Sequence, residues 1–324
     1  MAYLEVRDVS VDYLMENSRV HAVDHVSFSV NKGDSVGIVG ESGSGKSTLG
    51  LAMLRLLDGK AADVRGQCLL EGQDLLSLDE KQLHEIRWRR LAAVFQKSMN
   101  ALSPVHKIGR QMMDVYRTNH PETSKTQAKE RVLTVLRQVN LADRVFSSYP
   151  HELSGGMMQR TAIALSLLNN PDLIIFDEAT TALDVVTQGQ ILKEVQQLEK
   201  ELGLTRLMIT HDISVVAASC SHVAVMYAGR LMEYGPTSQV LRNPKHPYTQ
   251  GLLRAYPSLK GEKTVLQGIP GTLPDLKSDM PGCAFAPRCP YVTALCRGTR
   301  PEMRSISSAW SVSCHRQEEG DAHD

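Results

Sequence analysis

The chain has 324 residues, 42% of them hydrophobic, and its 36 lysines and arginines balance its 36 aspartates and glutamates. This length predicts about two domains and a core that needs no disulfide bonds. The zero net charge argues against a protein that binds nucleic acid mainly through phosphate contacts. Since no apolar run is long enough to span a membrane and the N-terminus lacks the features of a signal peptide, we expect a soluble, cytosolic chain.

Strands and helices alternate over the first 240 residues. Residues 26–30 alternate apolar and polar side chains, as in a half-buried strand. Residues 35–40 predict a short buried strand that leads into a glycine-rich turn and a helix over 48–57. Further elements are expected as helices over 79–90, 105–118, 124–140 and 186–202, and as buried strands over 173–176 and 206–210. This order predicts an α/β fold with parallel β-α-β units.

The glycine-rich turn matches the pattern G-x-x-x-x-G-K-[ST]. Glycines at such positions let backbone N–H groups surround a phosphate at the N-terminus of a helix. Lys46 would reach the β- and γ-phosphates of ATP, and the Ser47 hydroxyl would coordinate Mg²⁺. A merely flexible loop is the weaker interpretation, because the turn lies between a buried strand and a helix. Its residues are Gly40, Glu41, Ser42, Gly43, Ser44, Gly45, Lys46, Ser47 and Thr48.

Two carboxylates follow the buried strand over 173–176. Asp177 and Glu178 are expected at the carboxyl edge of the sheet, where nucleotide phosphates bind in such folds. Asp177 would hold Mg²⁺, directly or through water, and Glu178 would polarise the attacking water. Seen alone, such a pair more often belongs to a turn or a helix cap, but together with the phosphate loop it indicates catalysis.

A second anion-binding pattern lies over residues 153–160. Ser154 follows Leu153 and would cap a helix that runs to Leu168. The helix dipole and the hydroxyl suit a phosphate. Because the chain already has its own phosphate loop, this second site suggests the nucleotide of a partner chain.

Residues 153–156, with the sequence Leu-Ser-Gly-Gly, resemble the signature of ATP-binding cassette (ABC) ATPases, and the resemblance covers about residues 3–250. It implies a P-loop NTPase fold, with a RecA-like core and a helical signature subdomain over about 100–165. It also implies a head-to-tail dimer with two ATP molecules, each between one subunit's phosphate loop and the partner's signature. The signature residues expected to act on the partner's nucleotide are Leu153, Ser154, Gly155, Gly156, Met157 and Gln159.

The resemblance assigns roles to further residues. Gln96 matches the Q-loop and would join Ser47 and Asp177 around Mg²⁺, and His211 matches the switch histidine that touches the γ-phosphate. With Lys46 and Glu178, Gln96 and His211 form the expected catalytic set. The D-loop is matched by Ala182, Leu183 and Asp184.

An aromatic side chain is expected to stack on the adenine. Tyr13 is the first choice, although Tyr3 and Phe28 are alternatives. The family usually has a proline after the catalytic glutamate, where this chain has Ala179. That difference affects backbone stiffness rather than chemistry, so we expect the chain to hydrolyse ATP.

The pattern changes beyond about residue 240. Eight prolines between 244 and 290 predict a loop-rich segment that does not extend the sheet. We therefore expect an ABC ATPase domain over 1–250 and a loop-rich, cysteine-containing extension over 251–324. Residues 243–250 and 268–271, together with four cysteines, resemble the C-terminal extension of oligopeptide and dipeptide importer ATPases.

The four cysteines of the extension have the spacing C-x5-C-x6-C-x17-C. Thiolates are soft ligands that suit zinc or iron–sulfur clusters. The wide intervals favour a [4Fe-4S] cluster, which the resemblance also implies, with Zn²⁺ as the alternative and unligated thiols as the least favoured interpretation. The proposed ligands are Cys283, Cys289, Cys296 and Cys314. Cys68 and Cys220 are expected to be buried thiols.

The resemblance implies an ATPase subunit that powers uptake of dipeptides or oligopeptides. Its expected partners are a second related ATPase, which would make a heterodimer, two transmembrane permeases and an extracytoplasmic binding protein, with no nucleic acid. The subunit would lie peripherally on the cytoplasmic face of the inner or plasma membrane. Nickel or oligosaccharide import is the alternative. An exporter ATPase and a non-transport ABC ATPase that acts on DNA or ribosomes are less favoured.

Overall fold

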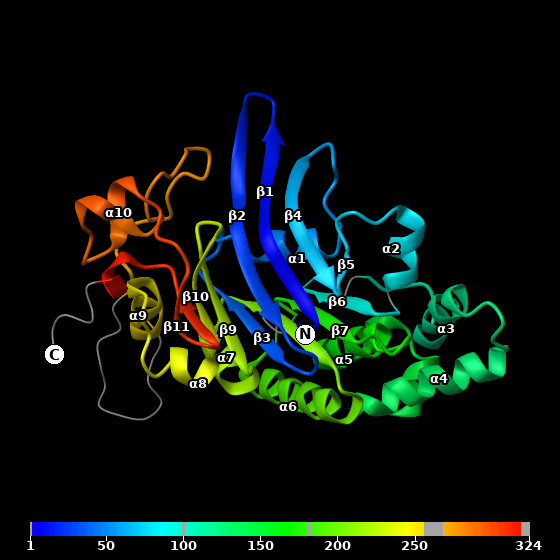
Figure 1. Ribbon diagram of the computed structural model, residues 1–324. Helices are drawn as coiled ribbons and strands as arrows, with labels where there is room; N and C mark the ends of the chain where they lie inside the picture. The colour runs from blue at the N-terminus through cyan, green and yellow to red at the C-terminus, as the bar shows by residue number, and fades with distance from the viewer. Residues whose placement is uncertain are drawn as a thin grey trace. The chain divides into compact units, whose positions relative to one another are not determined.

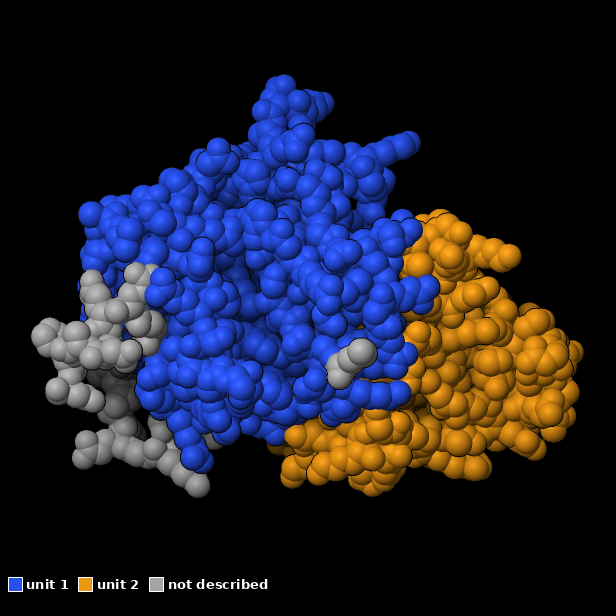
Figure 2. Space-filling view, in the orientation of Figure 1, with its two compact units in different colours: residues 1–77, 209–324 blue, residues 78–208 orange. Residues whose placement is uncertain are grey.

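The computed structural model describes residues 2–87, 89–96, 98, 101–179, 183–255 and 268–318. The chain folds as two compact units, which are residues 1–77 with 209–324 (unit 1) and residues 78–208 (unit 2) (Figure 2). Unit 1 is thus built from both ends of the chain and contains the C-terminal extension. No helix in the described ranges is both long and apolar enough to cross a membrane.

Unit 1 contains an antiparallel sheet with the strand order β2-β1-β4-β5. Its long strands β1, β2 and β4 lie side by side (Figure 1). Buried and exposed side chains alternate at the end of β2, as the pattern over 26–30 predicts. The strands are β1 (Leu4–Met15), β2 (Ser18–Val30), β4 (Ala62–Leu70) and β5 (Gln73–Asp74).

A second group of strands in unit 1 has the order β11-β12-β10-β9-β3. The pairing of β3 with β9 is parallel, as expected for β-α-β units. In β3, a Cβ at Gly37 would lie 2.4 Å from Val216 of α7, so the helix packs directly on the strand. The strands are β3 (Ser35–Val39), β9 (His222–Tyr227), β10 (Arg230–Pro236), β11 (Arg304–Ser307) and β12 (Trp310–Val312). The helices of this unit are α1 (Lys46–Met53), α7 (Ile213–Ser219), α8 (Thr237–Val240), α9 (Pro247–Arg254) and α10 (Ala294–Gly298).

The expectation that the extension adds nothing to the sheet is wrong. β12 pairs antiparallel with β10, with Val312 opposite Glu233 and Ser311 opposite Tyr234, and β11 pairs with β12. No strand forms among the described residues between 244 and 290, where the eight prolines lie, but the two strands begin after the last proline, Pro301. The extension is therefore part of unit 1 rather than an annex beside it.

The described residues of unit 2 form the strands β8, β7 and β6, in that order, and the α-helices α2 to α6. β6 and β7 are parallel. Capping boxes fix the starts of α2 and α4, where Asp79 pairs with Gln82 and Ser124 with Gln127. The strands are β6 (Leu91–Phe95), β7 (Leu173–Asp177) and β8 (Thr205–Thr210), of which 205–208 belong to this unit. The helices are α2 (Glu80–Ile86), α3 (Ile108–Asn119), α4 (Lys125–Gln138), α5 (Gly155–Ser166) and α6 (Val185–Leu202).

The predicted elements up to residue 210 are present, with shifts at their ends. The helix expected over 48–57 is α1 (Lys46–Met53), which is shifted at both ends. It begins earlier because the phosphate loop turns directly into it. It ends earlier because Leu54 is its C-cap and Arg55 has a left-handed backbone, with φ at 51°.

Candidate functional site

The glycine-rich turn joins β3 to α1. A Cβ at Gly40 would lie 2.0 Å from the carbonyl oxygen of Met226, and one at Gly45 would lie 2.1 Å from that of Ala22. Only glycine fits at these two positions. Gly45, with φ at 91°, is the N-cap of α1, and within the described chain no side chain caps that end of the helix. The turn therefore presents a helix N-terminus that suits an anion.

Lys46 lies inside the turn. Its Nζ donates hydrogen bonds to the carbonyl oxygens of Gly40 and Glu41, both at 2.8 Å, and lies 3.2 Å from Ser44 Oγ. The Lys46 and Ser44 side chains are buried. The ammonium group is thus fixed at the centre of the loop, where a phosphate would meet it. Three residues of the turn are exposed, namely Ser42, Gly43 and Ser47.

Tyr13 of β1 lies next to the turn. Its hydroxyl is 3.2 Å from Thr48 Oγ1, in the first turn of α1, and its side chain is half-buried. The two alternative aromatics belong to the core, since Tyr3 and Phe28 are both buried. Of the three aromatics, Tyr13 is the one that is only half-buried, and it lies beside the turn.

Gln96, Asp177 and Glu178 share one edge of the unit 2 strands. Phe95 of β6 is paired in register with Asp177 of β7, so Gln96 and Glu178 follow these neighbouring strands at the same edge. Asp177 and Glu178 are half-buried, and Gln96 is exposed. Glu178 has a left-handed backbone, with φ at 49°. Such strain in a residue other than glycine is concentrated at functional sites.

The signature residues surround the start of α5. Ser154 is the N-cap, and its Oγ accepts a hydrogen bond from the Met157 N–H at 3.4 Å. Ser154 and Gly155 are exposed, which suits contact with a partner's nucleotide, whereas Leu153, Gly156 and Met157 are half-buried. Gln159 is fully buried, and its amide has no hydrogen-bond partner among the described residues. Its position favours a role in packing.

The D-loop residues lie beside the signature. A Cβ at Gly155 would lie 3.7 Å from Leu183 Cδ2, and one at Gly156 would lie 2.8 Å from Thr187 Cγ2. Asp184 caps α6 by accepting a hydrogen bond from the Thr187 N–H at 2.9 Å, and this bond holds the pKa of Asp184 below its usual range. Ala182 lies outside the described residues.

His211 is the first residue after β8 and is exposed. The next residue, Asp212, caps α7 by accepting a hydrogen bond from the Ser214 N–H at 2.8 Å. The phosphate loop, Tyr13 and His211 therefore belong to unit 1, while Gln96, the two carboxylates, the signature and the D-loop belong to unit 2.

Two residues missed from the sequence contact the phosphate loop, one from α9 and one from the extension. Arg288 and Tyr248 both bind Glu41. Arg288 stands inside the interval between Cys283 and Cys289, which the sequence marks only as a spacer. The motif pattern around residues 243–250 includes Tyr248 but gives no sign of its partner.

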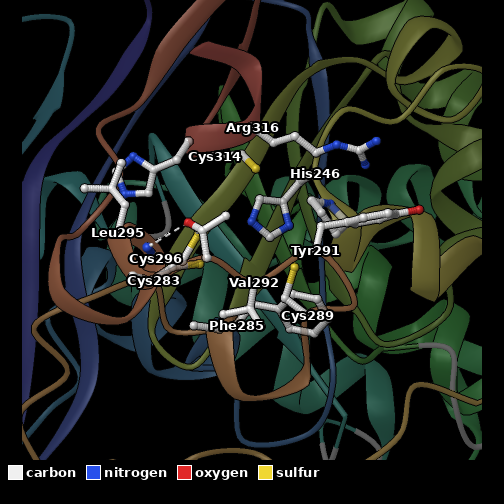
Figure 3. A pocket seen from close by; sticks show the side chains of 15 residues that line it. His246, Cys283, Phe285, Cys289, Tyr291, Val292, Leu295, Cys296, Cys314 and Arg316 are labelled. Atoms are coloured by element: carbon white, nitrogen blue, oxygen red, sulfur yellow. Dashed lines mark hydrogen bonds between the residues drawn. The ribbon is translucent and has the colours of Figure 1, made fainter. Parts of the chain in front are cut away.

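The four cysteines of the extension line one cavity of about 590 Å³ (Figure 3). All four are free and half-buried, and Phe285 and His246 line the same cavity. Burial raises the pKa of the Cys283 thiol to about 11, and the other three thiols raise it as well. Burial also raises the pKa of Cys289 and of Cys314. The expectation that Cys68 and Cys220 are buried is confirmed.

The thiols are not arranged for a single metal ion. In the described part of the chain, no group of three or more His, Cys, Asp or Glu residues could hold a metal ion as it stands. In Figure 3 the side chains of Cys283 and Cys296 are drawn close together, while those of Cys289 and Cys314 lie apart from them and from each other. The donor chemistry is that of a soft-metal site, and the open cavity between the thiols suits a larger group than one ion.

Comparisons with known proteins agree with this architecture. The family model for ABC transporters matches residues 23–181, and the model for the oligopeptide/dipeptide transporter C-terminal region matches residues 232–296. The "Probable peptide ABC transporter ATP-binding protein y4tR" of Sinorhizobium fredii is 42% identical over 98% of this chain and 95% of its own length. The "Dipeptide transport ATP-binding protein DppD" of Haemophilus influenzae is 40% identical over 97% of this chain and 96% of its own length.

A solved structure supports the fold. The post-hydrolysis dimer of the ATP-binding cassette MJ0796, bound to ADP and Pi, has a TM-score of 0.64 at 28% identity. The match covers 72% of this chain and 98% of that cassette. The chain therefore belongs to the ABC transporter family, as an ATP-hydrolysing cassette that carries the oligopeptide/dipeptide transporter C-terminal region.

Proposed function

We propose that the chain powers the uptake of dipeptides or oligopeptides by an ABC importer. The observation that carries this proposal is the match of residues 232–296 to the oligopeptide/dipeptide transporter C-terminal region, since this segment is additional to the cassette itself. Nearly full-length relatives named as peptide or dipeptide transport ATP-binding proteins support the same assignment. Substrate choice would be made by other chains of the importer.

ATP binds at the phosphate loop in this proposal. Lys46 meets the β- and γ-phosphates, a role supported by the fixed position of its ammonium group within the turn. Tyr13 stacks on the adenine, supported by its contact with Thr48. Oxygen atoms of Ser47, Gln96 and Asp177 would hold Mg²⁺, which neutralises phosphate charge.

Hydrolysis takes place at the edge of the unit 2 strands that bears Glu178. Glu178 orients and polarises the attacking water, and the strained backbone at this residue supports a functional role. His211 donates to the γ-phosphate and responds to its loss. Loss of the γ-phosphate then switches the chain between two arrangements, as in other nucleotide-driven switches.

Two cassettes act together, with the signature of one subunit on the nucleotide of the other. The exposed N-cap Ser154 supports this arrangement. So do Val185 and Val186, which directly follow the D-loop and are 83% and 71% exposed. Apolar side chains this exposed beside two functional motifs fit a surface that a partner covers. The partner would be a second, related ATPase.

An importer also needs partner proteins that cross the membrane and that deliver the substrate. Two transmembrane permeases would receive the motion of the loop after Gln96, and an extracytoplasmic binding protein would deliver the peptide. The chain would then be peripheral, on the cytoplasmic face of the inner or plasma membrane, through its contact with the permeases.

The four cysteines would hold a [4Fe-4S] cluster. The support is the shared cavity, the donor set and the free state of Cys283, Cys289, Cys296 and Cys314. Bound as thiolates, Cys283, Cys289 and Cys314 would lose the protons that their raised pKa values favour. The cluster would link four points of a segment with little regular structure, which gives it a structural role. Zn²⁺ is the second candidate, and it would require the thiols to approach one another.

The test is uptake of a labelled dipeptide and a labelled tripeptide by cells whose only copy of this chain carries Glu178→Gln. We expect uptake to be lost and to return with the unmutated chain. Peptide uptake that continues unchanged would contradict peptide import, and nickel or an oligosaccharide would then be tested in the same cells. Recovery of the chain with ribosomes or DNA, instead of with membrane permeases, would contradict transport altogether.

A further inference from the structure

Glu41, the second residue of the phosphate loop, is held by an arginine of the C-terminal extension. Arg288 Nη1 donates a hydrogen bond to Glu41 Oε2 at 2.8 Å. The Arg288 side chain is only 5% exposed, and Glu41 is 29% exposed. This pair joins residues 247 positions apart in the sequence. The extension thus places a fixed positive charge beside the loop.

The guanidinium group of Arg288 also makes contacts with residues other than Glu41. Its Nε donates to the carbonyl oxygen of Pro270 at 2.7 Å, and its Nη2 donates to that of Ile269 at 2.9 Å. It also lies over the ring of Tyr227, 5.6 Å from the ring centroid, with the hydroxyl 3.3 Å from Nη1. These contacts fix the direction in which Nη1 points, so they determine where the Glu41 carboxylate lies.

The backbone of Glu41 is held as well. Its N–H donates to the hydroxyl of Tyr248, a fully buried residue of α9, at 2.9 Å. Its carbonyl oxygen accepts the hydrogen bond from Lys46 Nζ. The position of the lysine that meets the phosphates is therefore tied, through one residue, to two side chains of the C-terminal part of the chain.

A carboxylate in a phosphate loop disfavours the binding of a triphosphate, because both carry negative charge. A triphosphate carries several negative charges, and Glu41 adds another on the residue whose carbonyl binds Lys46. Like charges this close repel unless a cation compensates them. We propose that Arg288 is a positioning residue for ATP binding, which neutralises the Glu41 carboxylate and holds it in place. The proposal rests on the phosphate loop being the ATP site, as proposed above.

The test is a double-mutant cycle on the full-length chain, with the Kd for MgATP measured by titration calorimetry. Arg288→Gln removes the charge but keeps a hydrogen-bond donor, and we expect the Kd to rise about tenfold. Arg288→Lys keeps the charge but loses the hydrogen bonds to Pro270 and Ile269, so we expect a Kd between those of Arg288→Gln and the unmutated chain. Arg288→Met is the second neutral variant, to be used if Arg288→Gln does not fold. Arg297→Met, which removes an exposed arginine of the same extension, is the matched control.

Rescue separates charge compensation from a purely structural role. If Arg288 acts by neutralising Glu41, then Glu41→Gln combined with Arg288→Gln binds MgATP more tightly than Arg288→Gln alone. The defect of Arg288→Gln should also shrink as sodium chloride is raised, because salt screens the repulsion. A double variant as weak as Arg288→Gln, with a salt-independent defect, would overturn the proposal.

Lys46→Ala distinguishes failure of the role proposed for Arg288 from failure of the ATP-site assignment. If Lys46→Ala loses affinity for MgATP while Arg288→Gln binds like the unmutated chain, the role of Arg288 is overturned and the ATP site stands. If Lys46→Ala binds MgATP unchanged, the assignment of the phosphate loop itself is overturned.

Discussion

The indole Nε1 of Trp310 donates a hydrogen bond to Oε1 of Glu233 at 2.9 Å and joins β12 to β10 by side chains as well as by backbone pairing. Glu233 is fully buried and also accepts hydrogen bonds from the backbone N–H groups of Lys245, at 2.9 Å, and His246, at 3.0 Å. One carboxylate therefore connects the cassette strand β10 to both the start of α9 and the end of the extension.

Removal of the Glu233 carboxylate should destabilise the chain strongly. Glu233→Ala leaves three donors without their acceptor, two of them buried, and we expect the free energy of unfolding to fall by about 3–5 kcal/mol. Trp310→Phe removes one donor of this set and should have a smaller effect. Urea unfolding followed by circular dichroism measures both, with Glu302→Ala, at an exposed position of the extension, as control. Equal stability of Glu233→Ala and the control would contradict this role.

The exposed valines after the D-loop give a test of the proposed dimer. Glu178→Gln should block hydrolysis and retain ATP, so that the closed dimer accumulates and is visible by size-exclusion chromatography with light scattering. In that background, Val186→Asp places a charge on the surface beside the signature, and we expect ATP-dependent dimerisation to weaken by at least about tenfold. Val105→Asp is the matched control, because Val105 is 73% exposed but lies outside the D-loop.

A dimer that forms equally well with Val186→Asp would show that this surface is not buried on association. Loss of dimer with both aspartate variants would instead indicate a general effect of an added charge, and the assignment of this surface would then fall.

The proposed cluster predicts the metal content of the chain. Protein purified without oxygen should be brown and contain about four irons per chain, with a matching amount of acid-labile sulfide. Cys283→Ser should lose most of the iron, because one ligand of the cavity is removed. Cys220→Ala, at a buried thiol elsewhere in the same unit, should keep it. One zinc per chain without iron would contradict the cluster and support the alternative.

The parts of the site that could be predicted from sequence are those whose geometry is local. The phosphate loop lies within nine consecutive residues. Its pattern is visible in the sequence because glycine is required where a Cβ would collide with a backbone carbonyl oxygen, as at Gly40 and Gly45. The place of Asp177 and Glu178 was predictable because both follow a buried strand, and nucleotides bind at the carboxyl ends of parallel strands, whereas Gln96 was assigned by the family resemblance.

The parts that could not be predicted depend on contacts between distant residues. β12 has only three residues, too few to show an alternating pattern, and the residues of β10 that pair with it lie 77 and 79 positions earlier. The pair between Arg288 and Glu41 gives no sequence signal, since an arginine between two cysteines is compatible with an exposed loop. The prolines correctly indicated that the described residues between 244 and 290 form no strand, but they give no information about the residues that follow.

Asp24 of β2 should make the stability of unit 1 depend on pH. Its carboxylate accepts hydrogen bonds from Arg230 Nε at 2.6 Å and from Arg300 Nη1 at 3.0 Å, and His25 Nε2 lies 3.7 Å away. Arg230 also donates to the carbonyl oxygens of Met280 and Gly282, so this cluster anchors the extension to β2. Burial acts to raise the pKa of Asp24, but the two arginines outweigh it and hold that pKa below its usual range.

A carboxyl group whose pKa is lower in the folded than in the unfolded chain stabilises the fold above its unfolded pKa. That contribution is lost as the pH falls through the folded pKa. We therefore expect Asp24→Asn to reduce the free energy of unfolding by about 2–3 kcal/mol at pH 7. The difference from the unmutated chain should shrink steadily below about pH 4.

Urea titrations between pH 3 and pH 7 measure this effect. Asp143→Asn is the control, because Asp143 pairs with Arg137 at an exposed position and should change stability far less. A difference between Asp24→Asn and the unmutated chain that persists undiminished at pH 3 would mean that Asp24 acts through its shape and not through its charge. In that case Arg230 and Arg300 would hold the extension without needing an ionised partner.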